Sequence, residues 1–484
     1  MNDYGFWSVL PPLIAIILAI RTKQVYISLI MGIWFGWVIV SDWNIWTGTL
    51  NTMQGLVDVF KDEGNTRTIM FSALIGSLIL FIQKSGGVKG FVNWLERRLE
   101  KTEGKRQNIV VQLMAWITGV IIFVESNISV LTVGTLYRPV FDKLKISREK
   151  LAYVADSSSA PACIIMPFNA WGAFIIGLLL MQGFEQPFSV LLSSIKYNFY
   201  PILALIAVPV VILLNRDIGP MKKAEERTDN GQVLWPDSKP MMSDELTESE
   251  IAPHVKPRAF NMLIPLAVMV LSMPLMLYYT GRKSILTEGE ELGSFSNIIS
   301  NGSGSTSVLM AVVFSLLLCF VMYKAQKIFK VTEMAELALK GISEMMPLAL
   351  LMLMAFAISN VSKELNTGAY VAELTQAWLS PGLVPFIVFL VTAFIAFSTG
   401  TSWGTFGIMV AIAIPMARTL GADEVVTLAA VLGGGIFGDH CSPISDTTII
   451  SSMASATDHI DHVKTQLPYA LIVGGLAAIG YLII

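Results

Sequence analysis

Long apolar stretches recur along the whole chain, and short polar segments separate them. A helix needs about 20 mostly apolar residues to cross the hydrocarbon core of a membrane, with a working range of roughly 17–25. The stretches do not alternate between polar and apolar positions, as the strands of a membrane barrel would. The pattern therefore predicts an all-α polytopic membrane protein. The stretches with almost no charge include Phe6–Ile20, Ser28–Val40, Ile69–Ile82, Ile109–Phe123, Phe199–Leu214, Met262–Tyr279, Val308–Tyr323, Met345–Ile358, Val384–Phe397 and Leu467–Ile484.

The longest polar interruption divides these stretches into two groups of similar size. We expect a first membrane repeat at residues 1–215, a cytoplasmic linker at 216–258 and a second membrane repeat at 259–484. Three features recur in the same order in both halves, although chance similarity between apolar segments is the alternative. The matching pairs are Phe123 and Phe397, 274 positions apart, Pro139 and Pro415, 276 apart, and Asp156 and Asp439, 283 apart.

The charge of the short loops predicts the orientation, because Lys and Arg prefer the cytoplasmic side. Arg21 and Lys23 follow the first stretch where a signal peptide would carry a small-residue cleavage site, so we expect a span there. With the basic loops inside and the acidic or neutral loops outside, each half has about five spans and one unit that enters and leaves on the same side. An odd number of spans inverts the second half, as in many transporters.

The same-side units are predicted to be re-entrant hairpins with polar tips. One covers Asn108–Asp142 with its tip at Glu125–Asn127, and the other covers Leu383–Arg418 with its tip at Thr399–Thr401. Two further spans, Leu151–Leu180 and Val425–Met453, contain Pro, Gly, Ser and Asp at their centres. Pro removes a backbone donor and Gly permits non-helical angles, so we expect both helices to be broken near mid-membrane.

Broken helices and hairpin tips carry the candidate chemistry. Free backbone carbonyls must face protein, water or an ion in a membrane, and carbonyl, hydroxyl and carboxylate oxygens are the ligands of hard cations. A carboxylate at mid-depth costs about 2.5–3.5 kcal/mol on insertion scales, so it is expected to bind a cation or to take a proton. The candidate coupling residues are Asp156, Asp439, Asp446 and Glu125. Capping of a half-helix is the alternative for each of them.

A second group of residues is predicted to bind the ion or substrate, with Na⁺ at a subset of them. The group consists of Ser126, Asn127, Ser157, Ser158, Ser159, Thr399, Gly400, Thr401, Ser442, Pro443, Ser445 and Thr447. The hydroxyls could instead bond backbone within their own helix. His459 and His462 invite a metal interpretation, but we favour a polar loop after a span. We expect Trp171 and Trp403 to serve packing.

Composition agrees with a membrane protein and excludes some classes. Charged residues make up 14% of the 484 residues, whereas a soluble domain has about a quarter, and the mean hydropathy is +0.63. The net charge of −3 gives no argument for a nucleic-acid partner. Cys163, Cys319 and Cys441 lie in apolar segments and show no metal spacing, so we expect buried, unpaired side chains.

Two segments resemble the signatures of the NhaC-type sodium/proton antiporters, a family of the ion transporter superfamily. Asp156–Pro161 followed by Trp171–Phe174 resembles the first, and Gly438–Thr448 resembles the second. The resemblance implies inverted repeats, two hairpins, two broken helices and, usually, a homodimer in the cell (inner) membrane. It puts Glu125–Asn127 with Ser157–Ser159 in one site and Thr399–Thr401 with Ser442–Thr447 in its counterpart. His440 and Cys441 depart from the Lys and Leu that antiporters of the family often carry.

The predicted function is secondary active transport, with Na⁺ and H⁺ as coupling ions and without a further cofactor. Na⁺/H⁺ exchange is the leading hypothesis. Na⁺-coupled transport of an amino acid or a small carboxylate, such as malate or lactate, through the same site is the alternative. We do not expect an enzyme. Intramembrane aspartyl proteases resemble one another in a Gly-x-Gly-Asp motif, and the corresponding run here, Gly435–Asp439, is one residue too long. Two matched broken helices favour alternating access over a channel.

Overall fold

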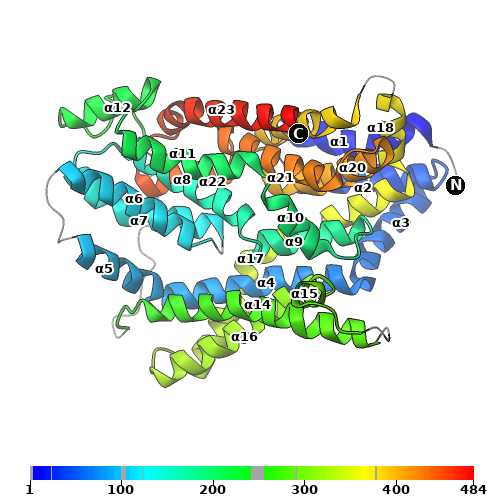
Figure 1. The fold of residues 1–484 in the computed structure, drawn as a ribbon, viewed down its shortest axis with the longest axis horizontal. Coiled ribbons are helices and arrows are strands. Elements are labelled where there is room, and N and C mark those ends of the chain that lie inside the picture. The colour runs from blue at the N-terminus through cyan, green and yellow to red at the C-terminus, as the bar shows by residue number, and fades with distance from the viewer. Residues whose placement is uncertain are drawn as a thin grey trace.

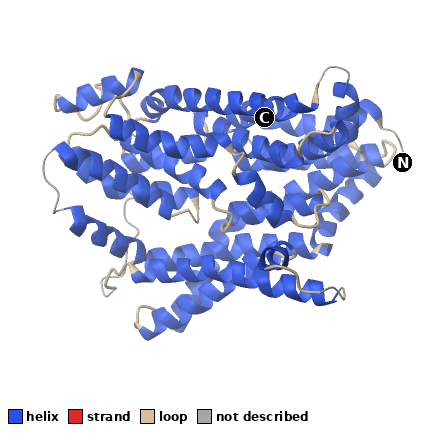
Figure 2. Cartoon of the chain, in the orientation of Figure 1, coloured by secondary structure: helices blue, strands red, loops and turns tan. Residues whose placement is uncertain are grey.

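The computed structural model describes residues 4–22, 24–99, 105–123, 125–240, 255–287, 289, 291–376 and 379–484. These residues form helices joined by loops, and most helices run along the long axis of the molecule (Figures 1 and 2). The first-half helices are η1 (Gly5–Val9), α1 (Leu10–Thr22), α2 (Val25–Val40), α3 (Ile45–Asp58), η2 (Val59–Lys61), α4 (Glu63–Lys84), α5 (Gly87–Leu99), α6 (Lys105–Ile121), α7 (Ser126–Lys143), α8 (Arg148–Ile165), α9 (Ala170–Met181), α10 (Pro187–Ile195) and α11 (Phe199–Leu214).

The linker contributes α12 (Gly219–Asp229) before the second half begins. The second-half helices are α14 (Phe260–Thr287), α15 (Phe295–Ser300), α16 (Gly304–Ala325), α17 (Val331–Glu364), α18 (Thr367–Gln376), η3 (Pro381–Leu383), α19 (Val384–Thr399), α20 (Ser402–Leu420), α21 (Glu424–Cys441), α22 (Asp446–Ser455) and α23 (His459–Ile483). Among the described residues, seven helices are long and apolar enough to cross a membrane, and ten spans result if each bent pair counts as one. The prediction of an all-α, multi-pass chain with broken helices is confirmed.

A helix–turn–helix unit lies at each of the two positions predicted for the hairpins. The chain turns between α6 and α7 just before Ser126, and between α19 and α20 at Gly400 and Thr401. Gly400 has φ +68°, the left-handed region that other residues rarely adopt. A Cβ there would lie 2.5 Å from the Ile444 carbonyl oxygen. The tip of the second hairpin therefore packs directly on the segment between α21 and α22.

The first broken helix is interrupted at Pro167, near the centre of the predicted span, and not at Asp156–Pro161. Helix α8 runs unbroken through Asp156–Pro161, and the break spans residues 166–169, with a bend of 42° between α8 and α9. The serine hydroxyls donate back to carbonyls of their own helix, and a single proline removes only one donor. Pro167 disfavours helical angles at the preceding residue, and Met166 is extended, with φ −92° and ψ 104°.

The second broken helix has its break at residues 442–445, with a bend of 45° between α21 and α22. The predicted glycine interruption is wrong in detail, because Gly433–Gly435 and Gly438 lie inside α21. A Cβ on Gly434 would lie 2.5 Å from the Phe389 carbonyl oxygen, and one on Gly438 would lie 2.1 Å from that of Ala393. These glycines allow α19 to approach α21 closely, so they serve packing.

The linker packs against the membrane helices at the end of the molecule where α8 and α23 begin. Arg227 makes two hydrogen bonds of 2.7 and 2.9 Å to the Glu149 carboxylate, and both side chains are buried. Lys150 pairs with Asp217 at 2.5 Å, and Asp217 also accepts a hydrogen bond from Tyr469 of α23. Figure 1 shows α12 at one corner of the molecule beside the first turns of α23. Residues 216–240 therefore join the start of α8 to the start of α23.

Candidate functional site

The end of α21 and the tip of the second hairpin form one part of the site. Asp439 is 3% exposed, and its Oδ2 accepts a hydrogen bond of 3.2 Å from the Ser402 hydroxyl at the start of α20. Its Oδ1 has no hydrogen-bond partner among the described residues. Ser442, the first residue of the break, donates to the Phe397 carbonyl oxygen at 2.7 Å. A buried carboxylate oxygen is thus left unsatisfied where the hairpin meets the break.

The first half contains a similar contact between hairpin and break. The Phe123 carbonyl oxygen accepts hydrogen bonds from Asn169 Nδ2 at 2.9 Å and from Cys163 Sγ at 3.1 Å. Asn169 also caps α9 by accepting from the Gly172 N–H group. Phe123 and Phe397 are the pair found 274 positions apart, and the breaks begin at Met166 and Ser442, 276 positions apart. In both halves a break residue therefore holds the carbonyl at a hairpin tip.

This register changes the expected pairing of the two aspartates. At an offset of 276, the counterpart of Asp439 is Cys163, whereas Asp156 lies about two helical turns farther from its break. The 283-position match between Asp156 and Asp439 is therefore not the structural one. The two aspartates come from different levels of their helices and occupy different surroundings.

The tip of the first hairpin presents Glu125 and Asn127. Glu125 caps α7, since its Oε2 accepts a 2.9 Å hydrogen bond from the Ile128 N–H group, as the capping alternative foresaw. It is 8% exposed and interacts electrostatically with Asp446. Asn127 Oδ1 is buried without a hydrogen-bond partner among the described residues. The tip thus offers a carboxylate and a free amide oxygen.

Asp446 opens α22 and differs from the other carboxylates because its side chain is exposed. Its Oδ1 accepts a hydrogen bond from the Thr447 N–H group at 2.9 Å. Asp446 also interacts electrostatically with Asp439 across the break. Asp446 therefore interacts with Glu125, Asp439 and Asp156, so the carboxylates of both halves form one acidic group near the second break. Such a group attracts cations.

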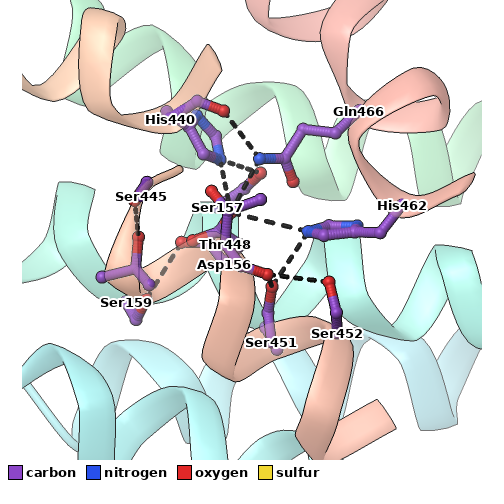
Figure 3. A network of polar contacts seen from close by, with 12 residues as sticks. Asp156, Ser157, Ser159, His440, Ser445, Thr448, Ser451, Ser452, His462 and Gln466 are labelled. Atoms are coloured by element: carbon purple, nitrogen blue, oxygen red, sulfur yellow. Dashed lines mark hydrogen bonds and ion pairs between the residues drawn. The ribbon is translucent and has the colours of Figure 1, made fainter. Parts of the chain in front are cut away.

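Asp156 is the centre of a fully buried network (Figure 3). Its Oδ2 accepts hydrogen bonds from Gln466 Nε2 at 2.7 Å and from the Thr448 hydroxyl at 3.2 Å. The same oxygen lies 3.9 Å from His440 Nε2 and 3.7 Å from His462 Nε2. Its Oδ1 has no partner among the described residues. A carboxylate of the first half is therefore held entirely by side chains of the second half.

Several members of this network were missed from the sequence. His440 bonds the Ser157 hydroxyl at 3.0 Å through Nε2 and the Tyr200 hydroxyl at 2.7 Å through Nδ1. Gln466 also donates to the His440 carbonyl oxygen at 2.9 Å. His440 could have been suspected as the neighbour of Asp439 that departs from the family pattern. Gln466 and Tyr200 had no signal, because they lie on ordinary apolar helices.

The histidines of the predicted polar loop lie at the start of α23 and contact α22 and the break. His459 bonds the Pro443 carbonyl oxygen at 2.6 Å and the Ser452 hydroxyl at 3.1 Å. His462 bonds the Ser451 hydroxyl at 2.9 Å, so the two rings have different partners. Within the described part of the chain, no three His, Cys, Asp or Glu side chains are grouped to hold a metal ion.

Most of the predicted hydroxyl ligands are engaged within their own segment. Thr399 bonds the Ile395 carbonyl oxygen, while Ser158 and Ser159 bond carbonyls of α8. Ser445 and Thr447 bond each other at 3.1 Å. Ser126 approaches the Glu125 carboxylate at 3.4 Å. The carbonyl oxygens of Thr401 and Pro443 are also engaged, since they accept hydrogen bonds from Thr405 and His459.

Known proteins share sequence and fold with this chain. The profile of the Na⁺/H⁺ antiporter family matches residues 162–484. An uncharacterized protein of Haemophilus influenzae is 33% identical over 99% of this chain and 90% of its own length. A malate-2H(+)/Na(+)-lactate antiporter of Bacillus subtilis is 30% identical over a local segment of 113 residues, which is 20% of this chain and 24% of that protein.

Solved structures of transporters have a similar fold. The YdaH transporter of Alcanivorax borkumensis superposes with a TM-score of 0.59 over 90% of this chain and 88% of its own, at 14% identity. MtrF of Neisseria gonorrhoeae superposes with a TM-score of 0.57 over 90% and 84%, also at 14% identity. At this level of identity the similarity concerns the fold alone.

Proposed function

Because the chain is a secondary transporter that belongs to the Na⁺/H⁺ antiporter family, we propose that it exchanges Na⁺ for H⁺ through the second break and the two hairpin tips. The observation that carries the proposal is a set of buried oxygens without hydrogen-bond partners among the described residues: Asn127 Oδ1, Asp156 Oδ1 and Asp439 Oδ1. Buried polar atoms are normally satisfied, and carboxylate and amide oxygens are the ligands of hard cations.

Within this function the carboxylates have different roles. Glu125 and Asp439 each interact electrostatically with Asp446, and these three carboxylates attract the cation. Asn127 supplies a neutral oxygen. Asp156, whose carboxylate is held by Gln466 and Thr448, is the carboxylate that takes the proton. Ser158, Ser159 and Thr399 are used within their helices, so we leave them out of the cation ligands. The backbone of Gly400 completes the site, and the Thr401 and Pro443 carbonyl oxygens, which Thr405 and His459 engage, are left out in the same way.

The proposed architecture is two inverted membrane repeats, residues 1–215 and 259–484, joined by a cytoplasmic linker at 216–258. The matched contacts of Phe123 and Phe397 with their breaks support this arrangement. Alternating access would move the hairpin tips and breaks together relative to the rest of the bundle. We further propose the cell membrane as the location and a homodimer as the assembly.

A second candidate is Na⁺-coupled exchange of a small carboxylate. The local similarity to a malate-2H(+)/Na(+)-lactate antiporter favours it. Two features could accommodate an organic anion beside the cation: the N-terminus of α9, which Asn169 caps, and Trp171, whose buried indole N–H has no partner among the described residues.

Transport in proteoliposomes with a trapped pH dye tests the leading proposal. Na⁺ added outside should collapse an imposed pH gradient, and K⁺ should not. Asp439→Asn should lower the initial rate at least about tenfold, the effect of losing an interaction of about 1.4 kcal/mol. Asp423→Asn is the matched control, because Asp423 only caps the other end of α21. The second candidate would be favoured instead if Na⁺ alone does not collapse the pH gradient but labelled malate or lactate is taken up when Na⁺ is present.

A further inference from the structure

One face of the half-helix α22 consists of buried hydroxyl groups. Thr448, Ser451, Ser452 and Ser455 are each at most 1% exposed. Their spacing of three, four and seven positions puts them on the same side of the helix. We call these four residues the hydroxyl face. It is continuous over the whole length of α22.

The hydroxyl face connects two parts of the molecule already described. At one end, Thr448 donates to Asp156 at 3.2 Å. At the other end, α22 stops at Ala456, whose carbonyl oxygen accepts from Arg148, and Asp458 accepts from the backbone of Lys239 in the linker. The face therefore runs from the buried carboxylate to the side of the protein where the linker lies.

Hydrogen bonds within the helix account for only part of this face. Ser451 and Ser452 donate to the Thr448 carbonyl oxygen, as serines in helices often do. The hydroxyls of Ser455 and of Thr457, which follows the helix, are fully buried and have no partner among the described residues. His462 Nδ1 and Gln466 Oε1 are also buried without a hydrogen-bond partner among the described residues. Buried polar atoms without a protein partner normally bind ordered water.

His462 lies beside both Asp156 and Ser451 of the hydroxyl face, as Figure 3 shows. Its Nε2 lies 2.9 Å from the Ser451 hydroxyl and 3.7 Å from Asp156 Oδ2, whereas Nδ1 has no partner among the described residues. The titratable groups around the ring are Asp156 from α8 and His440 from α21, with His459 and Asp461 preceding it on α23. An imidazole can accept a proton at one nitrogen and release one from the other.

We propose that the hydroxyl face, Thr457 and His462 form a proton route, with water between them, from the linker side to Asp156. The inference rests on the proposed Na⁺/H⁺ exchange and gives the proton a path apart from the cation. A proton enters the ring at Nδ1 from water, and Nε2, which lies 2.9 Å from the Ser451 hydroxyl of the face, releases its proton to the Asp156 carboxylate. The ring carries one proton before and after the transfer, so the net change is one proton moved from water to Asp156.

Two flux measurements on the same proteoliposomes test the route. The first is Na⁺-driven collapse of a pH gradient, which needs proton transfer. The second is exchange of isotopic Na⁺ at equal Na⁺ and equal pH on both sides, which moves no net proton. The variants are His462→Gln and the smaller double change Ser455→Ala with Thr457→Val. Thr427→Val is the matched control, because it removes a buried, unpartnered hydroxyl in the first turn of α21, far from this route.

We expect His462→Gln to reduce the proton-coupled flux at least tenfold and the double variant to reduce it several-fold, while Na⁺/Na⁺ exchange stays within twofold of wild type. Equal loss of both fluxes in both variants would overturn the route and assign the residues to folding or cation binding. Full retention of the proton-coupled flux would also overturn it. A wild-type protein without Na⁺ flux of either kind would refute the proposed function and the route with it.

Discussion

Glu225 is a half-buried carboxyl group outside the membrane spans, and its surroundings shift its pKa. It lies on α12, and one of its oxygens accepts hydrogen bonds from the Ser147 N–H group at 3.0 Å and the Ser147 hydroxyl at 2.5 Å. Burial raises the pKa of Glu225 above its ordinary value, although Lys150 and the bonds from Ser147 act in the opposite direction. The protonated form is therefore favoured more in the docked linker than in an undocked one.

The raised pKa gives the docking of the linker a defined dependence on pH. An acid whose pKa is raised by folding stabilises the folded state at low pH and loses this contribution as the pH rises through the raised value. We expect docking to weaken above the ordinary glutamate pKa of about 4.3. Limited proteolysis of the linker at a series of pH values measures this docking. Glu225→Gln keeps an acceptor for Ser147 and should flatten the dependence of linker cleavage on pH. A dependence that this substitution leaves unchanged would contradict Glu225 as its source.

At the residue scale, the sequence revealed carboxylates better than their partners. A charged residue inside an apolar stretch is visible because of its cost in a membrane, so Asp156, Asp439 and Glu125 stood out and are buried. Gln466 and Tyr200 gained their contacts only through tertiary packing between helices distant in sequence. Such contacts have no local signature. The pairing of Asp156 with Asp439 was wrong because it matched residues of the same type and not their positions relative to the two breaks.

At the element scale, the fit between a hairpin tip and a helix break should be sensitive to a single methyl group. Gly400→Ala costs about 1–2 kcal/mol for the left-handed backbone, and its Cβ would also meet the Ile444 carbonyl oxygen. Gly421→Ala is the matched control, since Gly421 has a similar φ of +73° and nothing within 4 Å of its Cβ. We expect Gly400→Ala to lower the melting temperature more than the control and to reduce transport. Equal effects of the two variants would contradict a role for the contact between Gly400 and Ile444.

Element boundaries show what local sequence can and cannot determine. Both hairpin turns and both breaks were predicted in the correct spans, because polar residues and prolines inside apolar stretches interrupt helices. The positions of the breaks required knowledge of neighbours: Gly434 and Gly438 are helical because α19 packs against them. Pro167, in contrast, acted locally on Met166, as the restriction on residues before proline predicts.

At the scale of the whole molecule, the two halves are interlocked rather than placed side by side. Asp156 of α8 is held by Gln466 of α23, and Ser77 of α4 donates to the Ala338 carbonyl oxygen in α17 at 2.7 Å. Gln182 and Ser359 bond each other at 3.0 Å. The linker adds Asp217, which Tyr469 of α23 contacts at 2.9 Å. Contacts between the halves thus occur at several separate places in the bundle.

This interlocking predicts that the two halves hold together without a continuous chain. A protease site inserted within residues 241–250 lies beyond the docked linker segment 216–240, so cleavage leaves its contacts with both halves intact. We expect the fragments to migrate as one species in detergent size-exclusion chromatography and to keep most of the Na⁺-driven transport. The closure entropy lost by cutting a connection is small compared with a buried interface of this extent. Separation of the fragments on cleavage would show that the linker, and not the interlocked helices, holds the halves together.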